Sequence, residues 1–190
     1  MNKTIKLIII ALIVVVAGAV LVFVFRGNNS NSTSNLVVNS AEDLTALVDK
    51  IYEGVTIEMP MLQTTTIETT DADMVKSFTG LDNGDNIQYL VASEPMMSSQ
   101  AYSLVLVKVK EGVNASDIAK TINENIDARK WICVTAEKVY TAASGDVVCL
   151  VMSNSETAKA VYDSFKVQAG SVTKEYERTE EEAPLPEDMY

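Results

Sequence analysis

The chain has 190 residues, of which 47% are hydrophobic, and its 26 acidic and 15 basic residues give a net charge of −11. It contains no histidine, which excludes Ser-His-Asp and Cys-His catalytic groups, histidine-ligated zinc and imidazole pH switches. An acidic surface is repelled by phosphate backbones, so we do not expect nucleic acid as a partner. The length suits one domain of roughly 140 residues with additional terminal segments.

A continuous apolar segment lies near the N-terminus. Residues 7–25 contain no charged or polar side chain, and as a helix they would span roughly 28 Å, which matches a bilayer core. Lys3 and Lys6 precede the segment and only Arg26 follows it, so the positive-inside bias predicts a cytoplasmic N-terminus and an extracytoplasmic remainder. We therefore predict a membrane anchor over residues 1–26 and a single-pass protein of the cell membrane.

The competing interpretation is a cleaved signal peptide, which would make the protein secreted. Residues 17–19, Ala-Gly-Ala, have the small-residue spacing that signal peptidases prefer. However, residues 20–25 stay strongly apolar beyond this sequence, which is unusual for a mature N-terminus. The uncleaved anchor is the favoured interpretation.

Two polar segments flank the expected folded domain. Residues 27–35 are small, polar and uncharged, and they are predicted to form a flexible spacer. Residues 175–190 contain seven acidic residues and a single arginine, and they are predicted to form a disordered acidic tail. Residues 36–174 are then the extracytoplasmic domain.

The first half of this domain is predicted to contain two helices around an extended segment. Ser40 starts the first helix with a capping box, and Gly54 ends it. Residues 55–67 are rich in β-branched side chains and are interrupted by Pro60, so they are predicted to be extended, with an edge strand. Asp71 begins a second, shorter helix.

The second half predicts two successive β-β-α units. The expected elements are strands over residues 87–93 and 101–109, a helix capped by Asn114, strands over residues 137–143 and 146–153, and a helix that begins at residue 154 or 155. Two such units predict an α+β fold, an antiparallel sheet of about four strands with helices packed on one face. The last strand is apolar on both faces, so the first two helices or the Thr-rich residues 63–70 are expected to cover the second face.

Four short motifs in this domain carry a resemblance to a known family. They are residues 80–82 (Gly-Leu-Asp), 95–97 (Pro-Met-Met), 104–108 and 145–152. On these motifs, residues 40–168 resemble the bacterial domain of unknown function 4358 family, uncharacterised exported proteins of clostridia and relatives. The resemblance implies an exported envelope protein, and it assigns no functional residue because the family has no known active site.

Few residues stand out as candidates for a site. Cys133 and Cys149 can form a disulfide if their strands are neighbours, although two separate buried thiols are favoured because the chain has no cysteine-rich framework. Pro95, Met96 and Met97 lie between two predicted strands, where thioethers offer an adaptable contact for a partner. For these methionines the favoured role is to close the end of the core.

Other patterns have a structural explanation. Trp131 is expected in the core, the alternative being a platform for a sugar ring. Residues 82–86 crowd oxygen ligands together but lack the spacing of a calcium loop, so a turn is expected. Ser171 and Lys174 match the S-x-x-K form of a serine nucleophile without its companion motifs. We expect no catalytic residue, no metal site and no cofactor.

The leading hypothesis is therefore a membrane-tethered, non-enzymatic binding or accessory module of the bacterial cell envelope. Its partner would be an envelope protein or a wall component. The alternatives are an envelope enzyme that uses carboxylates or a Ser-Lys pair, which requires a deep cleft lined by such groups, and a small-ligand sensor. A sensor would show a closed apolar pocket without ionisable groups.

Overall fold

The computed structural model describes residues 34–97, 99–131 and 133–180. These residues form four helices and one antiparallel sheet of six strands in the order β1-β2-β3-β5-β4-β6. The elements are α2 (Ala41–Glu53), β1 (Leu62–Thr66), α3 (Ala72–Thr79), β2 (Ile87–Pro95), β3 (Ser103–Val109), α4 (Ala115–Asn125), β4 (Lys138–Ser144), β5 (Val147–Ser153), α5 (Ser155–Ala169) and β6 (Lys174–Thr179). The predicted α+β class is confirmed, and an edge strand on each side extends the four expected strands to six.

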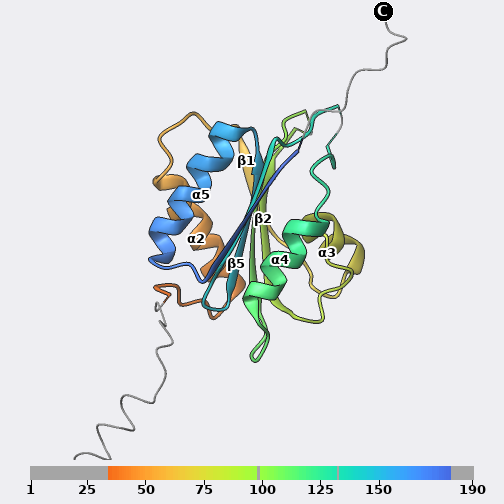
Figure 1. The fold of residues 1–190 in the computed structure, drawn as a ribbon, viewed down its shortest axis with the longest axis vertical. Coiled ribbons are helices and arrows are strands. Elements are labelled where there is room, and N and C mark those ends of the chain that lie inside the picture. The colour runs from red at the N-terminus through yellow and green to blue at the C-terminus, as the bar shows by residue number, and fades with distance from the viewer. Residues whose placement is uncertain (1–33, 98, 132, 181–190) are drawn as a thin grey trace, which may run out of the picture. The chain divides into compact units, whose positions relative to one another are not determined.

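Helices cover both faces of the sheet. Helices α2 and α5 lie on one face, and α3 and α4 lie on the other (Figure 1). The prediction that the helices pack on one face is wrong. The connections β3-α4-β4 and β5-α5-β6 both lead towards β6, but they start from antiparallel strands. Because such crossovers share one hand, their helices must lie on opposite faces.

The core therefore has two layers, separated by the central strands. All seven residues of β5 are buried. Alternate side chains of β3 and β5 enter the two layers: Leu104, Leu106, Cys149 and Val151 face α2 and α5, while Val105, Val107, Val148 and Leu150 face α3 and α4. The expected cover on both faces of β5 is confirmed, with α2 and α3 contributing one helix to each face. The Thr-rich segment instead supplies the edge strand β1.

The helices begin at the residues that the sequence predicts. Ser40, Asp71, Asn114 and Asn154 each accept a hydrogen bond from a backbone N–H in the first turn of the following helix. These caps satisfy N–H groups that have no partner inside the helix. The predicted strands of the two β-β-α units also begin and end within two residues of the observed ones.

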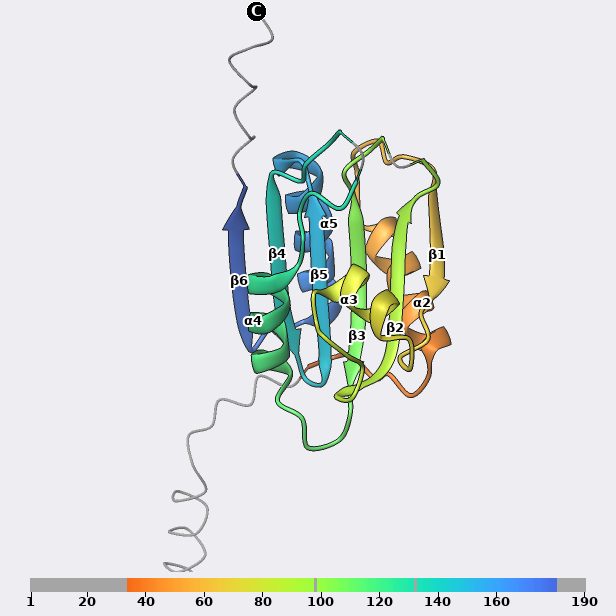
Figure 2. The same cartoon turned by 90° about the vertical axis from the view of Figure 1, so that its right-hand side faces the viewer.

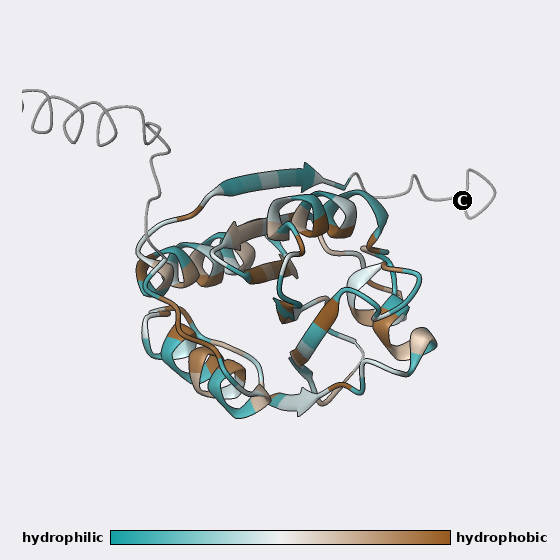
Figure 3. Ribbon diagram, turned by 90° about the horizontal axis from the view of Figure 1, so that it is seen from below, coloured by the Kyte–Doolittle hydropathy of each residue, from teal (hydrophilic) through white to brown (hydrophobic). Residues whose placement is uncertain are grey.

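Part of the segment predicted to be a disordered tail is a strand. β6 pairs with β4 through six residues, so residues 175–180 belong to the folded domain. Arg178 fastens this strand to the C-terminal end of α4, where its guanidinium donates to the carbonyls of Asn123, Glu124 and Ile126. Charged side chains suit a sheet edge, and β6 is mostly hydrophilic in Figure 3, where it precedes the grey C-terminal trace. The prediction failed because composition alone does not distinguish a charged edge strand from a tail.

The folded domain also begins earlier than predicted. The hydroxyl oxygen of Ser34 lies 2.8 Å from that of Ser144, and the Asn35 N–H donates to the carbonyl of Ala169 at 3.0 Å. These two residues therefore belong to the domain rather than to a spacer over residues 27–35. The predicted anchor over residues 7–25 lies outside the described residues, and no helix within the described part of the chain has the length and hydropathy to cross a membrane.

Candidate functional site

Exposed methionines gather at one end of the sheet, where β2 ends and β1 begins. The register places Leu62 opposite Pro95, and the Met96 N–H donates to the Met61 carbonyl at 3.3 Å. Four methionines of these two segments lie at this end, and we call them the methionine rim: Met59, Met61, Met96 and Met97. Met59 is half-buried against the α2 and α5 layer. The side chains of Met61, Met96 and Met97 are 77%, 64% and 69% exposed.

The exposure of Met96 and Met97 differs from the favoured sequence interpretation, in which they close the core. That role falls to Tyr102 and Met152, both fully buried at this end of the sheet. The partner-contact hypothesis for Pro95, Met96 and Met97 therefore stays open. Sequence reasoning missed Met59 and Met61 because no local pattern shows which strand pairs with β1.

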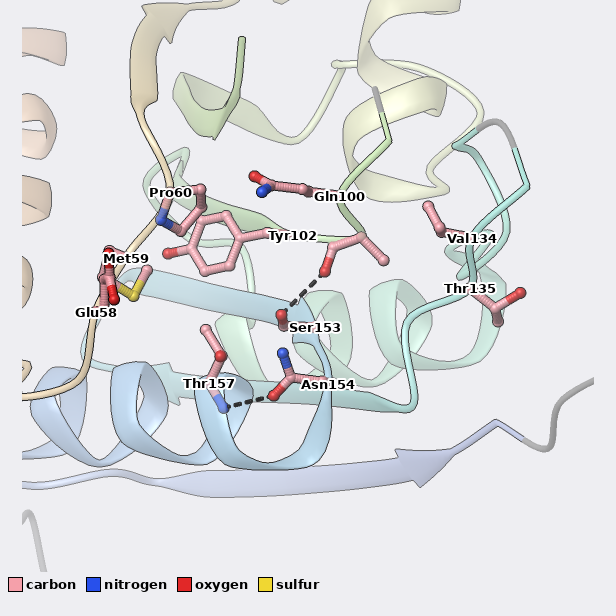
Figure 4. Close-up of a pocket in the computed structure, with 11 residues that line it drawn as sticks. Glu58, Met59, Pro60, Gln100, Tyr102, Val134, Thr135, Ser153, Asn154 and Thr157 are labelled. Atoms are coloured by element: carbon pink, nitrogen blue, oxygen red, sulfur yellow. Dashed lines mark hydrogen bonds between the residues drawn. The ribbon is translucent and has the colours of Figure 1, made fainter. Parts of the chain in front are cut away.

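A pocket of about 480 Å³ lies beside the rim (Figure 4). Its walls come from the connections α2–β1, β2–β3 and α4–β4 and from the first turn of α5. Figure 4 shows the ring of Tyr102 pointing towards Met59 and Pro60, so an aromatic floor adjoins the thioether of Met59. The pocket thus extends the apolar surface of the rim inwards.

Two polar side chains of the pocket form hydrogen bonds with other lining residues. The side chain of Asn154 accepts from the Thr157 N–H at 2.9 Å, and the Ser153 hydroxyl donates to the Ala101 carbonyl at 2.9 Å. Among the described lining residues, Glu58 carries the only formal charge. A nucleophile beside a base, or a pair of carboxylates, is the minimum for the expected hydrolytic chemistries. The described lining offers neither.

The hydroxyls of a buried tyrosine, Tyr102, and a half-buried one, Tyr52, pair beneath this end of the sheet. The Tyr102 hydroxyl donates to that of Tyr52 at 3.0 Å. Burial raises the pKa of Tyr52 to about 12 and that of Tyr102 well above its usual value. Both phenols therefore stay protonated at neutral pH. Beside them, the Thr64 hydroxyl donates to Ser93 at 3.1 Å and connects the side chains of β1 and β2.

A charged cluster that sequence reasoning missed lies on the other face. The ammonium group of Lys130 donates to Glu94 at 2.5 Å, and the Ser103 hydroxyl donates to the same carboxylate oxygen at 2.7 Å. Lys130 also lies over the rings of Phe78 and Trp131, 4.8 and 5.4 Å from their centroids. Burial lowers the pKa of Lys130, while the Glu94 charge opposes this shift. Lysine and serine share one acceptor oxygen of Glu94.

The tryptophan and the two cysteines that were candidates differ in their burial. Trp131 is half-buried against the α3 and α4 layer instead of lying in the core. Cys133 is exposed, with a left-handed backbone at φ 62°, whereas Cys149 is buried in β5, and both thiols are free. Burial raises the pKa of the Cys149 thiol, which makes it unreactive at neutral pH.

The remaining sequence candidates do not form a site. Residues 82–86 make a turn, and Gly84 is needed there because a Cβ would lie 2.0 Å from the Thr69 carbonyl oxygen. Ser171 follows α5, and Lys174 is exposed at the start of β6. Within residues 34–180, excluding 98 and 132, no cluster of three or more potential metal ligands occurs.

Comparisons with known proteins return no match: no family model, no curated protein and no solved structure matches the chain. The resemblance to the domain of unknown function 4358 family therefore rests on its short motifs alone.

Proposed function

We propose that the protein is a membrane-tethered, non-enzymatic binding module of the bacterial cell envelope whose methionine rim contacts a partner protein. The observation that carries this proposal is the gathering of exposed methionines beside a pocket of about 480 Å³. Contiguous exposed apolar side chains mark interaction surfaces in soluble domains. Flexible thioethers adapt to the shape of a protein surface, which favours a protein over a rigid small ligand.

The position at which the chain enters the domain supports this proposal. Ser34 lies beside Ser144, at the β4–β5 hairpin. The pocket includes Ser153, at the opposite end of β5, and the two ends of the sheet are well separated in Figure 2. Within the domain, the rim therefore lies at the end of the sheet opposite Ser34.

The tether itself is the apolar segment over residues 7–25, with an extracytoplasmic domain behind it. The basic residues Lys3 and Lys6 support this orientation. Cleavage after residues 17–19 would instead release the same binding domain as a secreted protein. The net charge of −11 argues against anionic lipid heads as the partner of the rim.

The alternative functions gain less support. An enzyme that uses carboxylates or a Ser-Lys pair needs two such groups in one cleft, and the described lining of the pocket has only the carboxylate of Glu58. A small-ligand sensor calls for an apolar pocket without ionisable groups. Glu58, Gln100 and Thr135 make this lining partly polar.

The test compares the variant Met96→Ser/Met97→Ser with the wild type. Because both side chains are exposed, we expect an unchanged melting temperature and the loss of a partner that is crosslinked to the wild-type full chain in living cells. The matched control is Val37→Ser/Val167→Ser, which alters valines that are 77% and 75% exposed away from the rim. Loss of stability in the methionine variant, or retention of the same partner, would refute the proposal.

A further inference from the structure

The two edges of the sheet differ in their protection against pairing with another strand. Four of the six residues of β6 are charged, which is a common protection of natural sheet edges. β1 has the sequence Leu-Gln-Thr-Thr-Thr, without a charge or a proline. Within the residues that the structure describes, β1 pairs only with β2, and it forms the outer edge of the sheet in Figure 2. It is an open edge without the usual protection.

The hydrogen-bond pattern shows which backbone groups of β1 face outwards. The Met96 N–H donates to the Met61 carbonyl, and the Ile67 N–H donates to the Leu90 carbonyl. Since hydrogen-bonded pairs alternate along an antiparallel ladder, residues 61, 63, 65 and 67 bond to β2. The N–H and C=O groups of Leu62, Thr64 and Thr66 therefore point towards the open edge.

We infer that β1 is the docking strand for an extended segment of the partner protein, which adds to the sheet as a seventh strand. This inference rests on the proposed function and specifies how the partner binds. Main-chain hydrogen bonds to residues 62, 64 and 66 provide the affinity in this mode, and side-chain pockets provide specificity. The added strand runs alongside Met61 and so reaches the methionine rim.

A small pocket beside β1 provides a place for a side chain of the added strand. Gln63 and Thr65 line it together with Phe78 of α3 and Glu94 of β2, and its volume is about 130 Å³. It lies on the sheet face that α3 and α4 cover. Because strand side chains alternate between faces, every second residue of an added strand projects towards this side.

The charges around β1 indicate which kind of extended segment can pair with it. Residues 53–75, which contain β1, include five acidic residues and no basic one. Lys130, packed over Phe78 beside the small pocket, is paired with Glu94. An extended segment flanked by Lys or Arg therefore complements the edge. A second copy of this chain would bring five further acidic residues to the same edge, so like charges oppose self-pairing.

Two variants of Thr64 distinguish the effect of losing its outward backbone N–H from the effect of losing its side chain. Thr64→Pro removes an outward N–H, and edge strands tolerate proline at such a position. Both Thr64→Pro and Thr64→Val remove the side-chain hydrogen bond to Ser93, but Thr64→Val keeps the backbone N–H. Thr64→Val is therefore the matched control, and comparison of the two melting temperatures reports any additional effect of proline on folding.

The probe is a synthetic peptide with a Val-Thr-Val-Thr-Val core and two lysines at each end, added to the full chain in detergent micelles. We expect binding to the wild type and Thr64→Val, and about tenfold weaker binding to Thr64→Pro. The same peptide N-methylated throughout its core, or flanked by glutamates, should also bind about tenfold more weakly.

Several results would overturn the inference. These are the absence of peptide binding to the wild type, equal binding to the two Thr64 variants, equal binding of lysine- and glutamate-flanked peptides, or a dimer of the chain that Thr64→Pro dissociates. If Met96→Ser/Met97→Ser loses its cellular partner while Thr64→Pro keeps both peptide and partner, the proposed function stands and the β1 inference fails. If the methionine variant keeps its partner, the proposed function fails.

Discussion

The half-buried phenol of Tyr52 couples the stability of the domain to alkaline pH. Burial raises its pKa to about 12 in the folded state, whereas a tyrosine in the unfolded chain titrates at about 10. Between these values the unfolded state binds fewer protons than the folded state, so the free energy of unfolding falls as the pH rises. This contribution to stability is fully present below about pH 10.

We predict that Tyr52→Phe makes stability less sensitive to alkaline pH. Through Tyr52 alone, the wild type should lose about 1.4 kcal/mol between neutral pH and about pH 11. The variant avoids this loss, but it is less stable by about 1 kcal/mol at neutral pH because the Tyr102 hydroxyl loses its acceptor. Urea denaturation at both pH values gives the two free energies. An equal alkaline loss in both proteins would contradict the role of Tyr52.

Contacts between residues close in the sequence could be predicted, whereas contacts between distant residues could not. The caps Ser40 and Asn114 act on backbone groups only a few positions away, so their roles are visible in the sequence. The contact between Glu94 and Lys130 joins residues 36 positions apart. Its partners meet only after β2 has paired with β3 and the α4–β4 connection has folded back, which no local pattern describes.

Among the elements, strand β6 has little hydrophobic surface to bury, and the polar contacts of one side chain hold it in place instead. The strand is short and mostly charged, and Arg178 joins it to three carbonyls at the C-terminal end of α4. Those carbonyls have no partner within the helix, and a cation is favoured at this end of the helix dipole. The composition of residues 175–180 predicted disorder because composition does not show a contact with residues so distant in the sequence.

We predict that Arg178→Ala destabilises the protein by about 2 kcal/mol, because it leaves half-buried carbonyls without a donor. The control is Lys174→Ala, at an exposed position of the same strand, which should cost less than about 0.5 kcal/mol. Hydrogen exchange of the β6 amides provides a second measurement and should become faster only in Arg178→Ala. Equal effects of the two substitutions would mean that Arg178 does not hold the strand.

The order of elements was predictable, but their arrangement in space was only partly so. Caps and alternating apolar residues located the two β-β-α units within two residues of their observed bounds. They did not show that the units pair through β3 and β5, nor that α4 and α5 lie on opposite faces. Those features follow from strand direction and crossover handedness, which depend on the whole sheet.

For the whole molecule, the central feature is the separation of the chain entry from the methionine rim. Ser34 lies at one end of the sheet, and the rim and its pocket lie at the other. From the sequence, Met96 and Met97 were candidates for a partner contact, although closing the core was the favoured role, while Met59 and Met61 joined the rim only through strand pairing. The open edge of β1 continues the same surface, so one partner segment can contact both.

In the proposed function, a partner protein contacts the rim end of the domain and not the entry end. The most direct measurement places a photo-reactive amino acid at Met97 or at Val37, both exposed, in the full chain and crosslinks living cells. We predict that position 97 yields a specific crosslink to one protein and that position 37 does not. The same crosslinking pattern at both positions, or no crosslink from position 97, would contradict the account.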